Sequence, residues 1–182
     1  WVQFKKYAEA LKTERTKQFS IIILDTVELL FRMCRKYVCV KRGIEHQSDE
    51  QWGKGYELVH DEFEQQIAQL ALLPYGLAFI SHSKEIEIRG RSIRTSKIVP
   101  TLPKQAHDIV APLADVIGYA GFATERADKG IGERIVYFEP DETIEAKDRT
   151  GLLPPKCALD FRVVKGHLEG KTERNEVEED EE

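Results

Sequence analysis

The stretch that decides the fold is Phe19-Ser20-Ile21-Ile22-Ile23-Leu24-Asp25-Thr26. Five of its first six residues are apolar, and isoleucine favours extended chain. A short apolar run of this kind predicts a buried central strand of an α/β sheet. The run ends abruptly at Asp25, so the strand delivers a carboxylate to the edge of the sheet. Asp25 is therefore the first candidate for a functional residue.

An aspartate in this position has two interpretations. In nucleotide hydrolases with a phosphate-binding loop, the Walker B aspartate at the end of a strand holds the water shell of Mg²⁺ beside the phosphates. Alternatively, Asp25 caps a helix that begins at Thr26, and Glu28 completes a capping box. The two interpretations are compatible, and the sequence alone does not choose between them.

A second apolar run, from Gly76 to Ser83, also ends on polar side chains. We predict that the two runs are parallel strands, whose carboxyl ends meet at the edge where ligands of open α/β sheets bind. Asp25 and His82 would then share a crevice. The simpler alternatives are that a backbone group satisfies His82 and that Ser81 only forms a turn.

Apolar spacing and turn residues predict the remaining elements. They are a helical segment at 1–17, a helix from Thr26 to Gly43, an exposed loop at 44–55, a helix over 56–70, a hairpin of 85–89 and 92–99, a short helix near 106–113, an antiparallel pair at 115–119 and 134–139, and an extended segment at 152–155. The order strand, helix, loop, helix, strand favours a parallel sheet with right-handed crossovers.

The predicted hairpin is basic in a protein whose net charge is −5. Residues 84–104 carry a local balance of +4. Five side chains are candidates for neutralising phosphates of a nucleic acid: Lys84, Arg89, Arg91, Arg94 and Lys97. A hairpin with a basic, solvated face is the equally acceptable alternative.

Length and composition restrict the class of protein. The 182 residues, 41% of them hydrophobic, suit one domain, which we predict at 1–168, followed by a disordered acidic tail at 169–182. No stretch reaches the roughly 20 apolar residues that span a bilayer, and no signal peptide is evident, so we expect a cytoplasmic protein without a membrane partner. The three cysteines have no CxxC spacing, so we expect reduced packing residues rather than disulfides or a zinc site.

Several motifs together resemble the phage-encoded RecA-like ATPases, which are AAA-type nucleotide-binding proteins of single-strand annealing recombination. The resemblance runs from about Trp1 to about Asp160 and is carried by Ile22-Ile23-Leu24-Asp25-Thr26-Val27, Gly53-Lys54-Gly55-Tyr56, Ile80-Ser81-His82-Ser83-Lys84-Glu85, Lys97-Ile98-Val99-Pro100-Thr101-Leu102-Pro103 and Ala146-Lys147-Asp148-Arg149-Thr150-Gly151. It implies a RecA-like P-loop NTPase core of α/β class, with a mostly parallel sheet flanked by helices and a C-terminal antiparallel pair.

The chain departs from that family in one respect. Family members carry an N-terminal strand, a Gly-rich Walker A loop and a catalytic glutamate before the Walker B strand, and these 182 residues contain none of them. Gly170-Lys171-Thr172 does not replace the loop, because the glycine required five positions before Gly170 is Lys165. Since the chain begins with Trp1, we expect a piece of a longer protein, and ATP hydrolysis that depends on the full-length protein supplying the loop.

The resemblance also implies roles for individual residues. Asp25 would bind Mg²⁺, and Asp25, Thr26 and Arg149 would contact ATP. Ser81 and His82 would sense the γ-phosphate. The loop 45–54 and the hairpin 84–104 would face single-stranded DNA. Arg149 would complete the site of a neighbouring subunit in a homo-oligomer, unless it only forms a surface salt bridge with Asp148 or Glu145.

These roles give the expected function, ATP binding and hydrolysis coupled to single-stranded DNA binding in phage recombination, in the cytoplasm of a bacterial host. The alternative is a non-catalytic DNA-binding or annealing module on a degenerate nucleotide-binding fold, in which Asp25 only caps its helix. A related helicase or regulatory ATPase is a third option.

Overall fold

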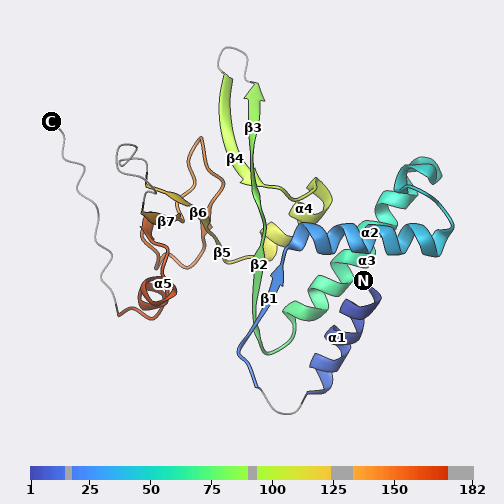
Figure 1. Ribbon diagram of the computed structural model, residues 1–182, viewed down its shortest axis with the longest axis horizontal. Helices are drawn as coiled ribbons and strands as arrows, with labels where there is room; N and C mark the ends of the chain where they lie inside the picture. Colours follow the sequence, from blue (N-terminus) through green and yellow to red (C-terminus); the bar gives the residue numbers. More distant parts are fainter. Residues whose placement is uncertain (15–17, 90–93, 124–132, 172–182) are drawn as a thin grey trace. The chain divides into compact units, whose positions relative to one another are not determined.

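The computed structural model describes residues 1–14, 18–89, 94–123 and 133–171. The chain forms two compact units (Figure 1). The first consists of Trp1–Ser83 and Pro100–Ala111, and the second of Lys84–Val99 and Pro112–Glu182. The predicted core domain covers both units. Of the predicted acidic tail, only 169–171 lie within the described residues.

The first unit combines helices with a small parallel sheet. Its elements are α1 (Val2–Thr13), β1 (Ile21–Asp25), α2 (Val27–Arg42), the 3₁₀ turns η1 (Gln47–Asp49) and η2 (Gln51–Gly53), α3 (Lys54–Ala71), β2 (Gly76–Ile80) and α4 (Lys104–Leu113). The predicted helices and strands of this unit are therefore confirmed, apart from shifts of a few residues at their ends. Gly43 ends α2 in a left-handed conformation with φ of 69°, which suits glycine.

Strands β1 and β2 pair in parallel, as the sequence predicts. Ile21 lies opposite Gly76, and Asp25 lies opposite Ile80. The prediction of a buried central strand is wrong, however, because the side chains of β1 are alternately exposed and half-buried. Ile23 is 56% exposed, and β2 is the only strand beside β1 within the described residues. A parallel strand is fully buried only where elements cover both of its faces.

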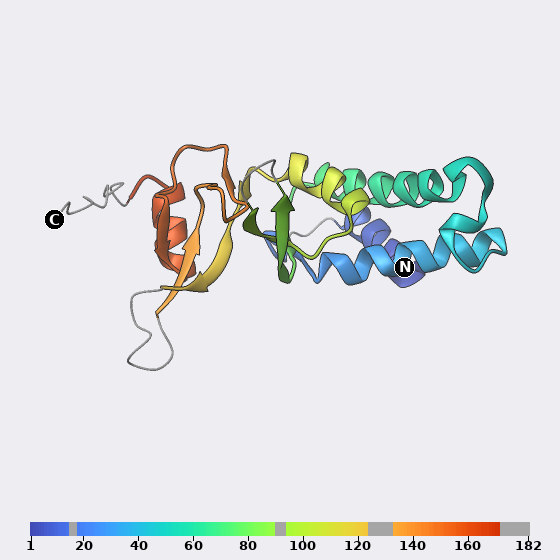
Figure 2. The same ribbon diagram turned by 90° about the horizontal axis from the view of Figure 1, so that it is seen from above.

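Helices α2 and α3 lie against each other and supply most of the core of this unit (Figure 2). The aromatic rings of Phe31 and Phe63 meet edge to face, with their centroids 5.1 Å apart. The other buried members include Val27, Cys34, Val38, Val59, Ile67, Ala106 and Ile109. Cys34 and Cys39 are free and buried, as expected for cysteines that pack in the core. Leu24 and Phe79 pack against the same core and fix the sheet to the helices.

The second unit is built mainly from short strands. Its elements are β3 (Ser83–Arg89), β4 (Arg94–Pro100), β5 (Val116–Ile117), β6 (Tyr119–Phe122), β7 (Arg134–Tyr137), β8 (Lys147–Asp148), β9 (Lys156–Ala158) and α5 (Phe161–Leu168). Strands β3 and β4 pair with each other, as the predicted hairpin requires. Strands β6, β7 and β9 form an antiparallel sheet over a small core of Val136, Phe138 and Leu153.

Two predictions about the sheets need correction. Within the described residues, β1 and β2 form the one parallel strand pair, and the strands belong to four small sheets, so a mostly parallel sheet is not what the structure shows. The predicted antiparallel pair exists, but the partner of β7 is β6, with Tyr119 opposite Tyr137. The sequence did not indicate β8, β9 or α5. Among the described helices, none is long and apolar enough to cross a bilayer.

Candidate functional site

The carboxyl ends of β1 and β2 form one edge of the first unit. Asp25 is the last residue of β1 and lies opposite Ile80, the last residue of β2. Ser81 and His82 follow directly. The parallel register therefore brings Asp25, Ser81 and His82 to the same edge of the sheet, where the sequence predicted them.

The Asp25 side chain is exposed at this edge. Within the described residues its carboxylate makes no hydrogen bond or ion pair. The predicted capping box is wrong, because α2 begins at Val27 and its N-cap is Thr26, which makes no side-chain capping bond. The carboxylate of Asp25 therefore remains available to a ligand.

Glu28 lies in the first turn of α2. Its side chain accepts hydrogen bonds from His82 and does not cap the helix. Its Oε1 accepts hydrogen bonds from the His82 ring Nδ1 at 2.6 Å and from the His82 backbone N–H at 3.2 Å. The Thr101 hydroxyl lies 3.4 Å from the same oxygen. The Glu28 side chain is only 12% exposed, whereas that of His82 is 75% exposed. The ring partner of His82 is thus a carboxylate, not the backbone group of the simpler alternative.

The electrostatics of Glu28 follow from these contacts. Burial of its carboxylate raises the pKa, but hydrogen bonds from the His82 ring and from the backbone N–H groups of Glu28 and His82, with a smaller effect of the nearby Ser81 hydroxyl, outweigh burial and lower the pKa of Glu28 to about 2. The contribution of Ser81 is the smallest of these, and its hydroxyl donates to the His82 carbonyl at 3.0 Å. Glu28 is therefore ionised at neutral pH.

The backbone carbonyl of His82 collects further hydrogen bonds. The Thr101 N–H and the Thr101 hydroxyl both donate to it at 2.8 Å. Sequence reasoning missed the contacts of Glu28 and Thr101 with His82, since it assigned Glu28 to a cap. The available signals were a glutamate close to the carboxyl end of a strand and a threonine in a motif that contributed to the family resemblance.

Arg149 belongs to the second unit. Its guanidinium forms an ion pair with Asp115 at 3.2 Å and donates to the Pro112 carbonyl at 3.1 Å. The predicted salt-bridge partners were Asp148 and Glu145, but the Asp148 carboxylate accepts from Thr150 and Leu153. The observed ion pair is thus of the predicted surface kind, with a different partner.

The structure describes the side chains of only two of the five basic residues predicted to contact DNA. Lys84 is exposed and Lys97 is half-buried. Lys97 lies near Asp141 and contributes to lowering the pKa of that carboxylate, after the hydrogen bonds from Thr143. Arg91 and the side chains of Arg89 and Arg94 lie outside the described residues.

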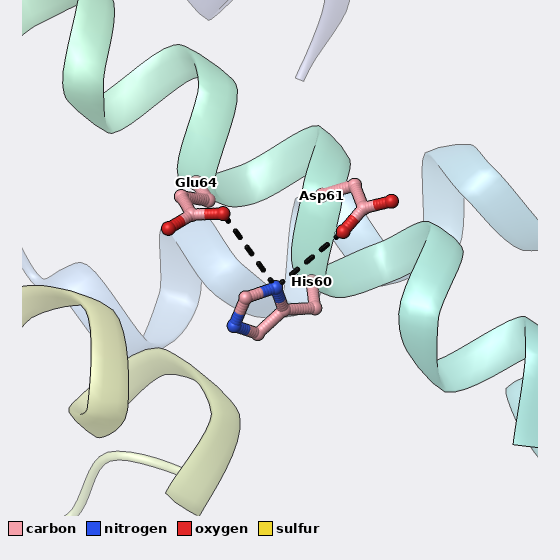
Figure 3. A group of neighbouring side chains, drawn as sticks. All are labelled: His60, Asp61 and Glu64. Carbon is pink, nitrogen blue, oxygen red and sulfur yellow. Dashed lines mark ion pairs between the residues drawn. The ribbon is translucent and has the colours of Figure 1, made fainter.

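A separate group of metal-ligating residue types lies on α3 (Figure 3). The His60 Nδ1 is 3.6 Å from Asp61 and 3.8 Å from Glu64, and the two carboxylates are 76% and 58% exposed. All three side chains come from one helix. Contacts between the half-buried His60 and acidic neighbours on the same helix account for their arrangement.

Comparison with protein families decides the class of this protein. A model of the AAA domain family matches residues 1–150. The chain belongs to the AAA domain family. Nothing among curated proteins or solved structures matches it.

Membership in the AAA family places the chain among ATPase-like, nucleotide-binding proteins, whose typical ligands are ATP and Mg²⁺. The oxygen donors at the strand ends suit this chemistry, because Mg²⁺ prefers carboxylate, hydroxyl and water oxygens. In this AAA domain, Asp25 is the residue predicted to hold the metal, and Thr26 is predicted to contact ATP.

Proposed function

We propose that this AAA domain binds Mg²⁺-ATP at the edge formed by the ends of β1 and β2. The observation that carries the proposal is the exposed Asp25 carboxylate, which has no partner in the described chain and lies at the same edge as Ser81 and His82. A surface aspartate without a role would also be exposed, but the parallel register brings Asp25 to the edge where ligands of open α/β sheets bind, and the AAA family match favours a nucleotide as ligand.

Each residue of the edge has a defined task in this proposal. Asp25 holds the water shell of Mg²⁺, and Thr26 adds a hydroxyl oxygen beside it. His82 contacts the γ-phosphate, and Ser81 supports the turn that presents it. Hydrolysis also needs a phosphate-binding loop, and the 182 residues do not contain the Gly-x-x-x-x-Gly-Lys-Ser/Thr sequence of such a loop.

The test is Mg²⁺-dependent binding of a fluorescent ATP analogue to the full-length protein. We expect Asp25→Asn to weaken binding in Mg²⁺ at least 10-fold, because the amide cannot replace the charge. The matched control is Asp61→Asn, which removes another exposed carboxylate, from α3, and should leave binding unchanged. Equal affinities of the Asp25→Asn variant and the parent protein would refute the proposal.

We further propose that the domain couples ATP hydrolysis to single-stranded DNA in phage recombination and acts as a homo-oligomer in the bacterial cytoplasm. The basic residues of the β3–β4 segment supply the charge for DNA contacts, and the exposed Lys84 is the best placed of those described. Lys97 is a weaker candidate because Asp141 already lies near it. Arg149 can serve a neighbouring subunit only if it leaves Asp115.

Salt dependence tests the DNA proposal. Lys84→Gln should lower the slope of log K for single-stranded DNA against log salt by about 0.7, the contribution of one phosphate contact. Lys6→Gln, an exposed lysine of α1, should not change it. Stimulation of ATP turnover by single-stranded DNA would show the coupling.

The alternative, a non-catalytic DNA-binding module, is favoured by one observation: the sequence has no Gly-x-x-x-x-Gly-Lys-Ser/Thr loop. Its assumption that Asp25 caps a helix does not agree with the structure. This alternative predicts DNA binding that is indifferent to ATP, to Mg²⁺ and to Asp25→Asn.

A further inference from the structure

Glu28 contacts His82 and Thr101, which lie where the chain leaves the first unit and returns to it. The three residues are called the Glu28 cluster. All three residues, Glu28, His82 and Thr101, belong to the first unit. The chain leaves that unit after Ser83 and returns to it at Pro100. His82 and Thr101 therefore flank the segment that carries most of β3 and β4, and one carboxylate contacts both.

The hydrogen bonds of the Glu28 cluster meet at His82. Thr101 donates its N–H and its hydroxyl to the His82 carbonyl, each at 2.8 Å. His82 in turn donates its backbone N–H and its ring to Glu28. The His82 backbone therefore links Glu28 to Thr101, because its N–H donates to Glu28 and its carbonyl accepts from Thr101.

The charge of Glu28 determines which ring nitrogen of His82 carries a proton. An ionised carboxylate only accepts hydrogen bonds, so Nδ1 must donate and must be protonated. Nε2 has no hydrogen-bond partner within the described residues, and the side chain is 75% exposed. Nε2 is thus the ring nitrogen that faces a ligand at the strand ends, and it donates to a phosphate oxygen when the ring carries a proton on both nitrogens.

We propose that Glu28 is a positioning residue, which fixes the His82 ring with Nε2 toward the ligand. Glu28 also joins the strand end of β2 to Thr101. A ligand contact at His82 therefore changes the hydrogen bonds of Thr101, at the base of the β3–β4 segment. This inference rests on the proposed function, because it takes the ligand to be a nucleotide phosphate. The hydrogen-bonded arrangement itself does not depend on the nucleotide and can be tested without it.

The first experiment measures the ¹⁵N chemical shifts of the His82 ring in the full-length protein without nucleotide. The parent protein should show a protonated Nδ1. Glu28→Gln should lose this signature, because an amide can donate as well as accept. Glu57→Gln is the matched control, since Glu57 is the first-turn glutamate of α3 and its loss changes the helix-end charge equally. An unaltered Nδ1 signal in Glu28→Gln would overturn the proposal.

Hydrogen exchange gives a second, independent measurement. In Glu28→Gln the amides of His82 and Thr101 should exchange about 10-fold faster, and in Thr101→Val the amide of residue 101 about 5-fold faster with the ring signature intact. Thr101→Val keeps the size of the side chain, so it remains informative if Glu28→Gln folds poorly. Unchanged exchange at residue 101 in Thr101→Val would contradict the proposed junction.

Nucleotide separates this inference from the proposed function. If a Mg²⁺-ATP analogue binds, exchange at Thr101 should change in the parent protein and not in Glu28→Gln. Binding without any change at Thr101 would overturn the coupling alone. Absence of binding would overturn the proposed function, and the ring signature and the exchange rates without nucleotide would still decide the role of Glu28.

Discussion

The two compact units differ in what holds each of them together. The first buries a large apolar core in which Phe31, Phe63 and Ile67 are almost completely inaccessible to solvent. The second has a small core of Val136, Phe138 and Leu153, and aspartates organise its loops. Asp141 accepts from Thr143 and Ile144, and Asp148 from Thr150 and Leu153.

This difference indicates how the candidate site is supported. The strands that carry Asp25 and His82 rest on the larger core through Leu24 and Phe79. Packing against close-packed side chains limits the movement of these strand ends, as a site of defined geometry requires. The second unit relies more on polar contacts, which are weaker individually and sensitive to pH.

The largest effect should come from the core of the first unit. Phe63→Ala removes a fully buried ring that contacts Phe31 and Trp1, so it should lower the free energy of unfolding by about 3–5 kcal/mol. Chemical denaturation measures the loss. Phe161→Ala, at a position that is 76% exposed, is the matched control and should have little effect. A small loss for Phe63→Ala would mean that the first unit does not depend on its core.

Glu28→Gln should have the next largest effect, about 1–3 kcal/mol at pH 7, because charged hydrogen bonds to His82 are lost. The pKa of Glu28 is lowered from 4.5 to about 2, so this contribution is complete above about pH 4.5 and disappears as the pH falls toward 2. Thermal unfolding of the parent and Glu28→Gln proteins at several pH values should therefore converge in acid. Glu57→Gln provides the control, and a difference independent of pH would contradict this assignment.

Asp148→Asn tests the polar support of the second unit. The amide NH₂ cannot accept from the Leu153 N–H, which now donates to Oδ2 at 3.0 Å, so we expect a loss of about 1 kcal/mol. Burial raises the pKa of Asp148, but the bonds from Thr150 and Leu153 outweigh it and lower the pKa. The contribution is therefore present above the ordinary pKa of aspartate and is lost at lower pH. Glu142→Gln, an exposed acid of the same unit, should leave denaturation unchanged.

Asp25→Asn should have the smallest effect on stability, within about 0.5 kcal/mol, because its exposed carboxylate has no partner in the described chain. The same substitution should nevertheless reduce Mg²⁺-dependent nucleotide binding. A combination of unchanged denaturation and weakened nucleotide binding distinguishes a ligand-binding acid from a structural one. A large loss of stability would instead assign Asp25 to the structure.

The sequence predicted the first unit better than the second. The pattern Val27, Phe31, Cys34, Val38 marks one face of α2, and the apolar strand runs are short and clearly bounded. Strands β5, β8 and β9 are only two or three residues long, so they carry no readable alternation. Their pairing depends on contacts between residues far apart in sequence, such as Val136 with Cys157.

The sequence by itself determined the AAA class, the helix faces and the parallel strand pair. It also placed Asp25 and His82 at strand ends, because local periodicity and motif residues encode these features. Only the tertiary structure decided that Glu28 binds His82 and Thr101 rather than a helix cap, and that the Asp25 carboxylate remains exposed and without a partner in the described chain. These contacts join residues 54 and 73 positions apart, and the free energy of such hydrogen bonds depends on burial and geometry that local sequence does not specify.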